Sequence, residues 1–314
     1  MNGRLLEWLR CPDCGERVEQ RTADTLHCRG CAHAFEVRGG APRFCSGSTR
    51  TAAYFGYGWG VHTASVTPPQ SPAPWHLRTM QDAVGAPSFD GLIVDAGCGD
   101  GTDLALLSLD PRCEVVGVEL STGGVATSLR RTDGLERAHV VQADLLNLPL
   151  ASGRFDGAYS YGVVHHTPDP SRAVREIART LKPGASLLLY VYEDFSDRSP
   201  GWRVALRAVN LARVITTHLP APLLLAICRA LSPIVYVLLT VPSRRFRWAA
   251  RFPYRHNTNA WDLGEDLYDR FAAPIEKRYS ERTAAALVRD AGLEVVKTAQ
   301  CRGWIVWGRK PVTP

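Results

Sequence analysis

The stretch that decides the fold of this 314-residue chain is Leu92-Ile93-Val94-Asp95-Ala96-Gly97-Cys98-Gly99-Asp100-Gly101-Thr102. An apolar run ends in an acid, and a glycine-rich turn leads into a helical pattern over about 103–108. This order predicts a buried parallel strand, a tight turn and the start of a helix. Glycines remove Cβ atoms where a ligand must approach the backbone, and the helix start offers unpaired N–H groups. We therefore expect a ligand with a negative or carbonyl-rich part at this turn.

The acid before the first glycine narrows the choice of ligand. A G-x-G-x-G turn also suits dinucleotides, but Asp95 would repel a pyrophosphate and not the ammonium of an amino-acid moiety. About twenty residues beyond the turn, the strand pattern that starts at Glu114 and continues as the apolar run 115–118 ends in Glu119, where an acid can accept both hydroxyls of a ribose. The alternative is a plain strand, turn and helix in which the glycines serve packing alone.

The composition indicates an ordinary globular protein, with 45% hydrophobic and 22% charged residues. The length allows one large domain and a smaller one. A net charge of +6 permits an anionic partner without requiring one. The first ten residues lack the apolar core and cleavage site of a signal peptide, so we expect a cytoplasmic protein.

Two Cys-x-x-Cys pairs near the start of the chain predict a metal site. Cys11 and Cys14 are separated by thirteen residues from Cys28 and Cys31. Four thiolates at this spacing suit two knuckles around one tetrahedral zinc ion, with no open position for catalysis. A cytosolic location argues against disulfides as the alternative. Because so small a module has little core, we expect this structural zinc to supply much of its folding free energy.

Strand and helix patterns alternate through 91–193 and return near the end of the chain. The run 139–143 ends in Asp144, and the run 155–161 leads to the pair His165-His166. A helix over about 171–181 and a fifth strand over 186–192 follow. The last two strands are expected at 293–299 and 304–309, after a helix over 283–291.

These motifs resemble those of the class I S-adenosylmethionine (SAM)-dependent methyltransferases of type 11, closely over 91–193 and more loosely over 283–309. The resemblance implies a Rossmann-like, seven-stranded, mostly parallel sheet with helices on both faces and SAM as cofactor. It implies that Asp144 contacts the adenine amino group and that the backbone N–H of Leu145 contacts a ring nitrogen. The predicted cofactor contacts are Asp95, Gly97, Cys98, Gly99, Gly101, Glu119, Leu120, Asp144, Leu145 and Tyr161.

The first 45 residues resemble the zinc ribbons of certain bacterial rRNA guanine methyltransferases, and the small ribbon proteins that partner methyltransferases. The resemblance is carried by Cys-Pro-x-Cys-Gly, by Leu26-x-Cys28-x-x-Cys31, by Phe35 and by Gly40-x-Pro42-x-Phe44. We expect a ribbon over 1–45, a connector over 46–90 and a methyltransferase domain over 91–314. The connector is either a linker whose aromatics pack on the next domain or a lid in which Tyr54, Tyr57 or Trp59 closes over the cofactor.

A largely apolar stretch, 202–241, is predicted as a helical insertion within about 200–260. Prolines at 220, 222 and 233 interrupt it, so no uninterrupted run reaches the ~18–20 residues of a transmembrane helix. We expect amphipathic helices that cap a greasy substrate pocket, without a transmembrane span. The alternative is a peripheral membrane face over 203–241 with arginines at its rim. The basic, aromatic run 244–256 either contacts phosphate or forms a solvated loop.

Methyl transfer is an in-line displacement, so the protein must position the acceptor and, for some acceptors, remove a proton. His165 and His166, with Tyr161 nearby, are the candidate catalytic residues, and one histidine is the candidate base. The alternative is that the pair shapes the loop and touches the cofactor.

Three functions fit the sequence. We favour methylation of a small, largely apolar, lipid-like or secondary-metabolite acceptor. RNA base methylation is the first alternative, although the ribbon is not very basic and an Asn/Asp-Pro-Pro-aromatic motif is lacking. A non-catalytic partner module is the second, and the intact acids Asp95, Glu119 and Asp144 argue against it.

Overall fold

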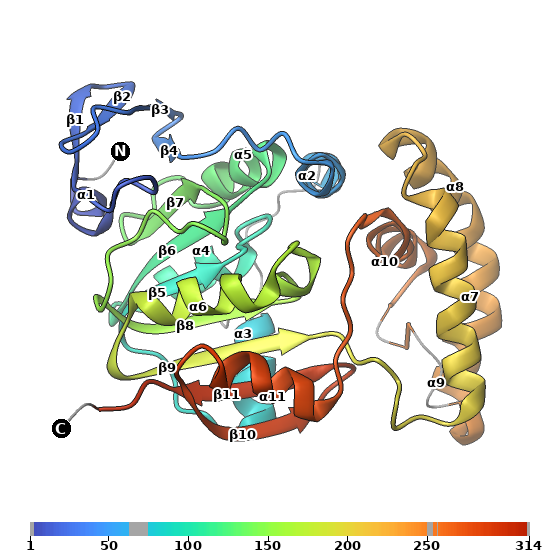
Figure 1. Cartoon of the computed structure of the whole chain (residues 1–314). Helices are drawn as coiled ribbons and strands as arrows, with labels where there is room; N and C mark the ends of the chain where they lie inside the picture. The colour runs from blue at the N-terminus through green and yellow to red at the C-terminus, as the bar shows by residue number, and fades with distance from the viewer. Residues whose placement is uncertain (1–2, 63–74, 250–253, 256, 313–314) are drawn as a thin grey trace. The chain divides into compact units, whose positions relative to one another are not determined.

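The computed structural model describes residues 3–62, 75–249, 254–255 and 257–312 (Figure 1). The chain divides into two compact units. We call Met1–Asp197 with Ile275–Pro314 the sheet unit, and Arg198–Pro274 the helical unit. Residues 63–74 of the predicted connector lie outside the described residues, as do Arg251 and His256 of the predicted basic run.

Seven strands of the sheet unit form the predicted mostly parallel sheet, in the order β7-β6-β5-β8-β9-β11-β10. The first five are parallel to one another, whereas β11 is antiparallel to both β9 and β10. The two strands predicted near the end of the chain are therefore confirmed, and they form an antiparallel pair. The strands are β5 (Gly91–Ala96), β6 (Cys113–Glu119), β7 (Ala138–Gln142), β8 (Phe155–Tyr161), β9 (Leu181–Val191), β10 (Glu294–Gln300) and β11 (Trp304–Arg309).

Helices cover both faces of this sheet because successive strand residues point to opposite sides. Val94 of β5 joins a core with α6 and α11, whereas its neighbour Ile93 joins a core with α3 and α4. Helix α6 begins where the side chain of Asp169 accepts a hydrogen bond from the Arg172 N–H, and Pro170 fits its first turn. The helices are α2 (Arg50–His62), α3 (Trp75–Val84), α4 (Thr102–Ser108), α5 (Thr122–Arg131), α6 (Pro170–Thr180) and α11 (Glu281–Arg289).

The sheet is larger than the predicted seven strands because the zinc ribbon continues it. The ribbon comprises α1 (Leu5–Trp8), β1 (Val18–Thr22), β2 (Thr25–Cys28), β3 (Ala34–Arg38) and β4 (Ala41–Arg43). Its last strand pairs in parallel with β7, where the Phe44 N–H donates to the Gln142 carbonyl at 2.8 Å. Without this pairing β7 would be an edge strand with unpaired backbone groups. The result is one sheet of eleven strands.

The ribbon contacts the rest of the sheet unit at a second place, beside α1. The Arg10 N–H donates to the Pro149 carbonyl at 2.9 Å, and the Ala151 N–H donates to the Trp8 carbonyl at 2.8 Å. The Trp8 ring also meets the His139 ring edge-on, with 5.4 Å between centroids. The ribbon is therefore a fixed part of the sheet unit.

The helical unit contains α7 (Pro200–Thr216), α8 (Ala221–Val235), η3 (Tyr236–Thr240), α9 (Val241–Arg245), η4 (Arg247–Ala249) and α10 (Ala260–Ala272). In it, Ala221–Arg245 forms one continuous helical run, and an 18-residue window of this run has a mean hydropathy of 2.1 with 28% of the window buried. By length and composition alone this run could cross a membrane. The expectation that prolines keep every apolar stretch shorter than a span was wrong.

The prolines fail to end this helix for local reasons. Pro222 lies in the first turn, where no N–H is needed. Pro233 lies inside the helix and leaves the Arg229 carbonyl without its usual N–H donor. The Ser232 hydroxyl donates to that carbonyl at 2.9 Å, and the wider π turn η3 follows. A neighbouring side chain and a local change of helix type thus accommodate the proline.

Candidate functional site

The glycine turn after β5 forms a tight backbone cradle. The N–H groups of Gly97 and Cys98 both donate to the Val118 carbonyl, at 2.8 and 3.1 Å. Gly97 has φ 92°, and a Cβ added there would overlap the side chain of Val163. A side chain at this position is therefore excluded by backbone conformation and by space.

Glu119, at the end of β6, joins its strand to the glycine turn. Its carboxylate accepts hydrogen bonds from the Ser121 N–H at 2.8 Å and the Gly99 N–H at 3.2 Å. Burial raises the pKa of Glu119, and these hydrogen bonds oppose the rise. A buried, well-oriented carboxylate of this kind can accept the hydroxyls of a ribose, as the sequence predicts.

Asp95, at the end of β5, is buried among other acids. Burial raises its pKa well above the ordinary value, while the Tyr159 hydroxyl opposes the rise. The charges of Asp103 and Glu119 raise the pKa further. An ammonium placed beside Asp95 would neutralise this cluster, so the residues fit the amino-acid part of SAM.

Asp144 follows β7, the next strand of the parallel sheet. One carboxylate oxygen accepts from the Leu146 N–H at 2.9 Å, and Leu145 is buried beside it. The Leu120 carbonyl, after β6, accepts from the Gln142 side-chain amide at 3.0 Å. Asp95, Glu119 and Asp144 thus lie at the carboxyl ends of three adjacent parallel strands, the edge at which such sheets bind ligands.

Helix α2 packs over the glycine turn. The nearest atom of the Trp59 ring is 3.1 Å from the position of a Cβ on Gly99. The Trp59 carbonyl accepts from the Thr127 hydroxyl of α5 at 3.3 Å. Of the three aromatic residues predicted for a lid, Trp59 lies against the turn, and Tyr54 is buried.

A chain of aromatic rings extends from the exits of β8 and β9. Tyr161 stacks on Tyr190 with 4.3 Å between ring centroids, and Tyr192 lies 4.1 Å from His165. Ring contacts of 4–6 Å connect, in order, His76, Tyr161, Tyr190, Tyr192, His165, His166 and Phe55. The predicted Tyr161, His165 and His166 therefore belong to one aromatic wall.

The two candidate histidines differ in their suitability as a base. His165 is fully buried between the rings of His166 and Tyr192. His166 Nδ1 lies 2.7 Å from the Ile275 carbonyl, which can only accept. Nδ1 must therefore carry the proton, which leaves a lone pair on Nε2 of the neutral ring. This tautomer makes His166 the better candidate.

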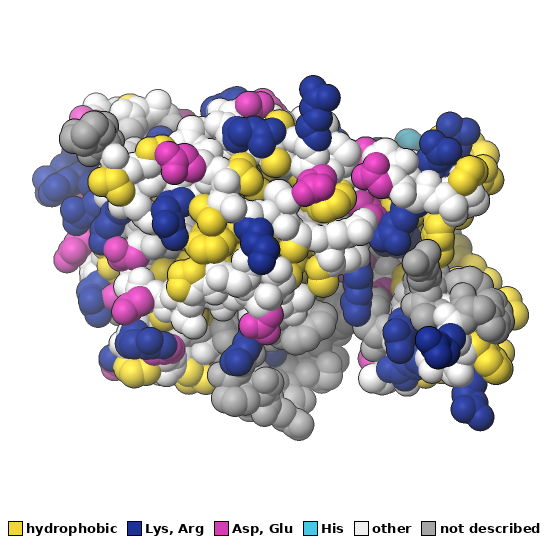
Figure 2. All heavy atoms as spheres, turned by 90° about the horizontal axis from the view of Figure 1, so that it is seen from below, with side chains coloured by type: hydrophobic (Ala, Val, Ile, Leu, Met, Phe, Trp, Pro, Cys, Tyr) yellow, Lys and Arg dark blue, Asp and Glu magenta, His cyan; other side chains and the backbone are white. Residues whose placement is uncertain are grey.

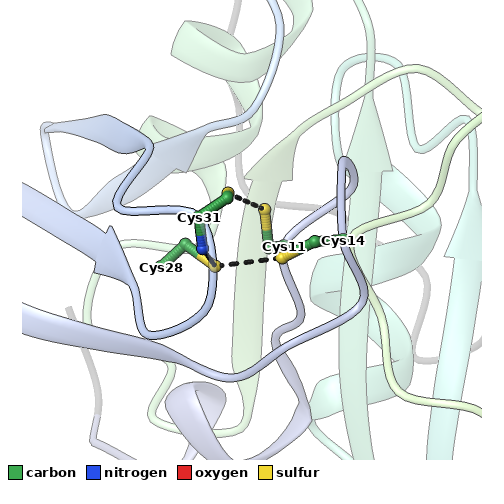
Figure 3. A group of neighbouring side chains, drawn as sticks. All are labelled: Cys11, Cys14, Cys28 and Cys31. Carbon is green, nitrogen blue, oxygen red and sulfur yellow. Dashed lines mark hydrogen bonds between the residues drawn. The ribbon is translucent and has the colours of Figure 1, made fainter.

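The four predicted metal ligands converge in the ribbon (Figure 3). Their sulfur atoms all lie within 4.8 Å of one another, with Cys14 Sγ 3.3 Å from Cys28 Sγ and Cys11 Sγ 3.6 Å from Cys31 Sγ. Zn–S bonds of about 2.3 Å in a tetrahedron require S···S separations of about 3.8 Å, so the cluster fits zinc. The Gly30 N–H also points at Cys28 Sγ, at 3.3 Å.

Two residues that shape the site lack a strong sequence signal. The buried Asp103 of α4 accepts from the Leu77 N–H of α3 at 2.9 Å and lies 3.5 Å from His76. Asp100, inside the glycine turn, pairs with Arg131 of α5 at 2.8 Å. Asp100 lies within the turn and Asp103 two residues after its last glycine, and this closeness in the sequence is the signal that could have identified them.

The comparisons with known proteins agree with this geometry. Residues 94–189 match the family model for a methyltransferase domain, and residues 3–40 match the model for Trm112p-like proteins. An uncharacterised 37.1 kDa transposon protein of Streptomyces fradiae is 37% identical over 116 residues, which are 36% of this chain and 33% of that protein.

Named relatives act on different acceptors. The malonyl-[acyl-carrier protein] O-methyltransferase of Enterobacter lignolyticus is 36% identical, over 38% of this chain and 45% of its own length. A probable tRNA methyltransferase 9B of Mus musculus is 35% identical, over 32% of this chain and 22% of its own length. The chain thus spans less than half the length of these curated relatives. A solved complex of the Haloferax volcanii Trm112 methyltransferase activator with a putative methyltransferase matches with a TM-score of 0.48 and 16% identity, over 83% of this chain and 97% of that one.

Over residues 94–189 the chain contains a methyltransferase domain of the SAM-dependent type. Its methyltransferase domain is preceded by a Trm112-like zinc ribbon with a four-cysteine cluster.

Proposed function

We propose that this protein transfers a methyl group to a small, largely apolar acceptor. The observation that supports the proposal is the aromatic wall from Tyr161 to His166, next to the predicted cofactor pocket. The nearby Arg278 pairs with Glu276 at 2.6 Å and lies over the Tyr192 ring, so its charge is already compensated. Aromatic faces with a compensated cation favour a flat, apolar molecule over a polyanion.

In this proposal the acids hold SAM, and the wall positions the acceptor. Asp95 binds the ammonium, Glu119 the ribose hydroxyls and Asp144 the adenine amino group. Bound SAM supplies an activated methyl group. Tyr161, Tyr190 and Tyr192 orient the acceptor by ring stacking, and His166 Nε2 accepts a proton from an acceptor hydroxyl or amine.

Titration calorimetry with SAM, followed by methyl-transfer assays with labelled SAM, tests the proposal. Small aromatic and lipid-like hydroxyl compounds are offered in parallel with total tRNA and rRNA. We expect the protein to bind SAM and the Glu119→Ala variant not to bind it. We also expect the labelled methyl group to appear in the organic extract, which contains the small acceptors. Glu136→Ala, at an exposed acid just before the amino end of β7 rather than at a carboxyl end, is the control for binding. Absence of SAM binding would reject catalysis as described, and label only in RNA would reject the acceptor class.

One observation favours RNA as a second candidate acceptor. A cleft of about 890 Å³ between the ribbon and the rest of the sheet unit is lined by Arg10, Arg17, Arg29, Arg154 and Arg179. Burial lowers the pKa of Arg10, and the charges of Arg17 and Arg154 lower it further. Glu7 and Glu176 also line the cleft, and Glu176 pairs with Arg179 at 2.9 Å, so a phosphate group there would contact chiefly Arg10, Arg17 and Arg154. The cleft, however, lies beside Arg154 and Arg179, at the start of β8 and β9 rather than at their carboxyl ends.

RNA retention at increasing salt tests this candidate. If RNA is the acceptor, Arg17→Gln/Arg154→Gln should weaken RNA binding and reduce its salt dependence. SAM affinity should stay unchanged because neither arginine lies near the glycine turn. Retention equal to that of the wild type would remove the support that the cleft provides.

A further inference from the structure

Exposed apolar side chains are concentrated in the helical unit. Among the described residues, thirteen of the sixteen large hydrophobic side chains that are exposed belong to Arg198–Pro274. Only Leu109, Val296 and Val312 belong to the sheet unit. Scattered exposed apolar residues are normal, but a concentration of this kind marks an interaction surface.

These side chains form a stripe along each of two helices. On the run from α8 to α9 they recur at helical spacing and include Leu231 (50% exposed), Ile234 (57%) and Leu238 (63%). On α7 the corresponding residues are Val204, Leu211 and Ile215. We call the two stripes together the apolar face; its members are Val204, Leu211, Ile215, Leu223, Ile227, Leu231, Ile234, Leu238 and Val241.

The charge on the segments that carry the apolar face has one sign, and the acids of the helical unit all lie on α10, at Asp262, Glu265, Asp266 and Asp269. Between Asp197 and Asp262 the sequence contains ten arginines and no acidic residue. The whole chain has a net charge of only +6, so the remainder is acidic on balance. Exposed arginines at 203 and 207 flank the stripe on α7, and those at 244, 245 and 247 follow the stripe on α9. Figure 2 shows yellow and dark blue side chains together on the part of the molecule that holds these helices.

The other side of α8 is packed within the helical unit and includes an ion pair. Arg229 pairs with Glu265 of α10 at 2.7 Å and lies 4.1 Å above the ring of Trp261. Leu224, Leu225 and Cys228 are buried on this side. Insertion of the run across a bilayer would carry the Arg229–Glu265 ion pair into hydrocarbon or break it. The geometry therefore suits a helix that lies in a membrane surface, although its length would allow a span.

We propose that the helical unit docks on an anionic lipid surface through the apolar face. The apolar side chains enter the boundary between headgroups and acyl chains, and the flanking arginines contact lipid phosphates and other anionic headgroups. The arginine-only charge pattern selects an anionic bilayer as the occupant rather than a neutral one. It also disfavours a second copy of the same face, whose arginines would repel those of the first. This inference is independent of the proposed methyl acceptor.

Vesicle flotation with the full chain tests the proposal. Vesicles of phosphatidylcholine alone are compared with vesicles that contain about 30% phosphatidylglycerol, a composition that gives the negative surface potential the arginines require. We expect at least tenfold stronger partition into the anionic vesicles, reduced by salt. Leu231→Glu/Ile234→Glu should lower that partition at least tenfold. The matched control Leu109→Glu/Val296→Glu makes the same charge change at equally exposed apolar positions of the sheet unit and should not.

A second variant separates charge from apolar insertion. Arg203→Gln/Arg207→Gln alters only exposed side chains and should reduce the preference for anionic over neutral vesicles. Unchanged thermal unfolding establishes that each variant is folded.

Four results would overturn the proposal. The first is that the wild type does not associate with vesicles, and the second is that Leu109→Glu/Val296→Glu lowers the partition as much as Leu231→Glu/Ile234→Glu does. The third is that vesicle-bound protein resists extraction with alkaline carbonate, and the fourth is a dimer in light scattering that Leu231→Glu/Ile234→Glu converts to a monomer. The third would indicate a span, and the fourth would indicate that a second copy covers the apolar face.

Discussion

The ring of Trp59 lies so close to Gly99 that a Cβ on that glycine would be 3.1 Å from the indole. Helix α2 and the glycine turn are therefore in close contact, although Trp59 and Gly99 are forty residues apart in the sequence. Because the turn is the predicted SAM cradle, this contact joins the stability of α2 to cofactor binding.

Gly99→Ala should damage both properties. The φ of 53° disfavours an L-residue by about 1–2 kcal/mol, and the contact with Trp59 adds to this. We expect a lower free energy of unfolding in urea and a weaker affinity for SAM in calorimetry. Gly60→Ala is the matched control, since a Cβ there meets nothing within 4 Å. Equal behaviour of the two variants would show that the turn tolerates a side chain.

Asp95→Asn should stabilise the ligand-free protein increasingly as the pH rises. Burial raises the folded-state pKa of Asp95, so above its unfolded pKa of about 3.9 the folded state binds more protons. Wild-type stability therefore falls as the pH rises toward the folded-state pKa, and asparagine removes this loss. Thermal unfolding at pH 5 and pH 8 should show a larger gain from the substitution at pH 8. A gain that is independent of pH would contradict the assignment.

His166→Asn should separate catalysis from structure. The asparagine amide can still donate to the Ile275 carbonyl but offers no base. We expect kcat to fall by about 10²–10⁴-fold with little change in SAM affinity. In a plot of rate against pH, the fall in rate on the acidic side should disappear. His218→Asn, at an exposed position of the helical unit, should leave kcat unchanged. Full turnover with an unaltered pH profile would reject His166 as the base.

Removal of zinc should release the ribbon from the sheet. We expect one zinc per chain by elemental analysis, lost in Cys14→Ser/Cys31→Ser and retained in Cys45→Ser, which alters a cysteine outside the cluster. Chelation should accelerate hydrogen exchange at the Ala151 amide, whose partner is the Trp8 carbonyl. Unchanged exchange after metal loss would show that the ribbon stays docked without zinc.

Lowering the pH should reduce the free energy of unfolding through His139, which lies beside the ribbon. Burial lowers the pKa of His139, against the opposing effect of Glu114, with which it bonds at 2.9 Å. Below the unfolded pKa of about 6.5 the unfolded state binds more protons, so stability is present above that pH and is lost as the pH falls. The drop in melting temperature from pH 7.5 to 5.5 should be smaller in His139→Gln, and unchanged in the exposed control His218→Gln.

Local sequence patterns predicted the strand, turn and helix around Asp95, the seven core strands and the four cysteines. Each depends on short-range chemistry, such as glycine where a Cβ would overlap Val163. The turns beside the two cysteine pairs predict a positive φ at Gly15 and Gly30; Gly15 has φ 77°, but the prediction is wrong for Gly30, which does not adopt a positive φ. Gly30 is required for space instead, because a Cβ there would be 2.8 Å from Glu16 Cγ.

Features that depend on distant residues could not be predicted in this way. The pairing of Phe44 with Gln142 has no signature in either segment, since any exposed strand edge could accept a partner. The helix through Pro233 continues because of the Ser232 hydroxyl and a π turn, which outweigh the usual effect of proline. The position of Trp59 on Gly99 likewise follows from how α2 packs against α5.

The join between β4 and β7 has a consequence for regulation. Because ribbon and methyltransferase domain share one chain, their association is intramolecular, with an effective concentration on the order of millimolar. Dilution cannot separate them, and neither part can be produced in excess of the other. If loss of zinc releases the ribbon as expected, the supply of zinc, rather than the abundance of a partner protein, sets how much of the protein has its sheet edge covered.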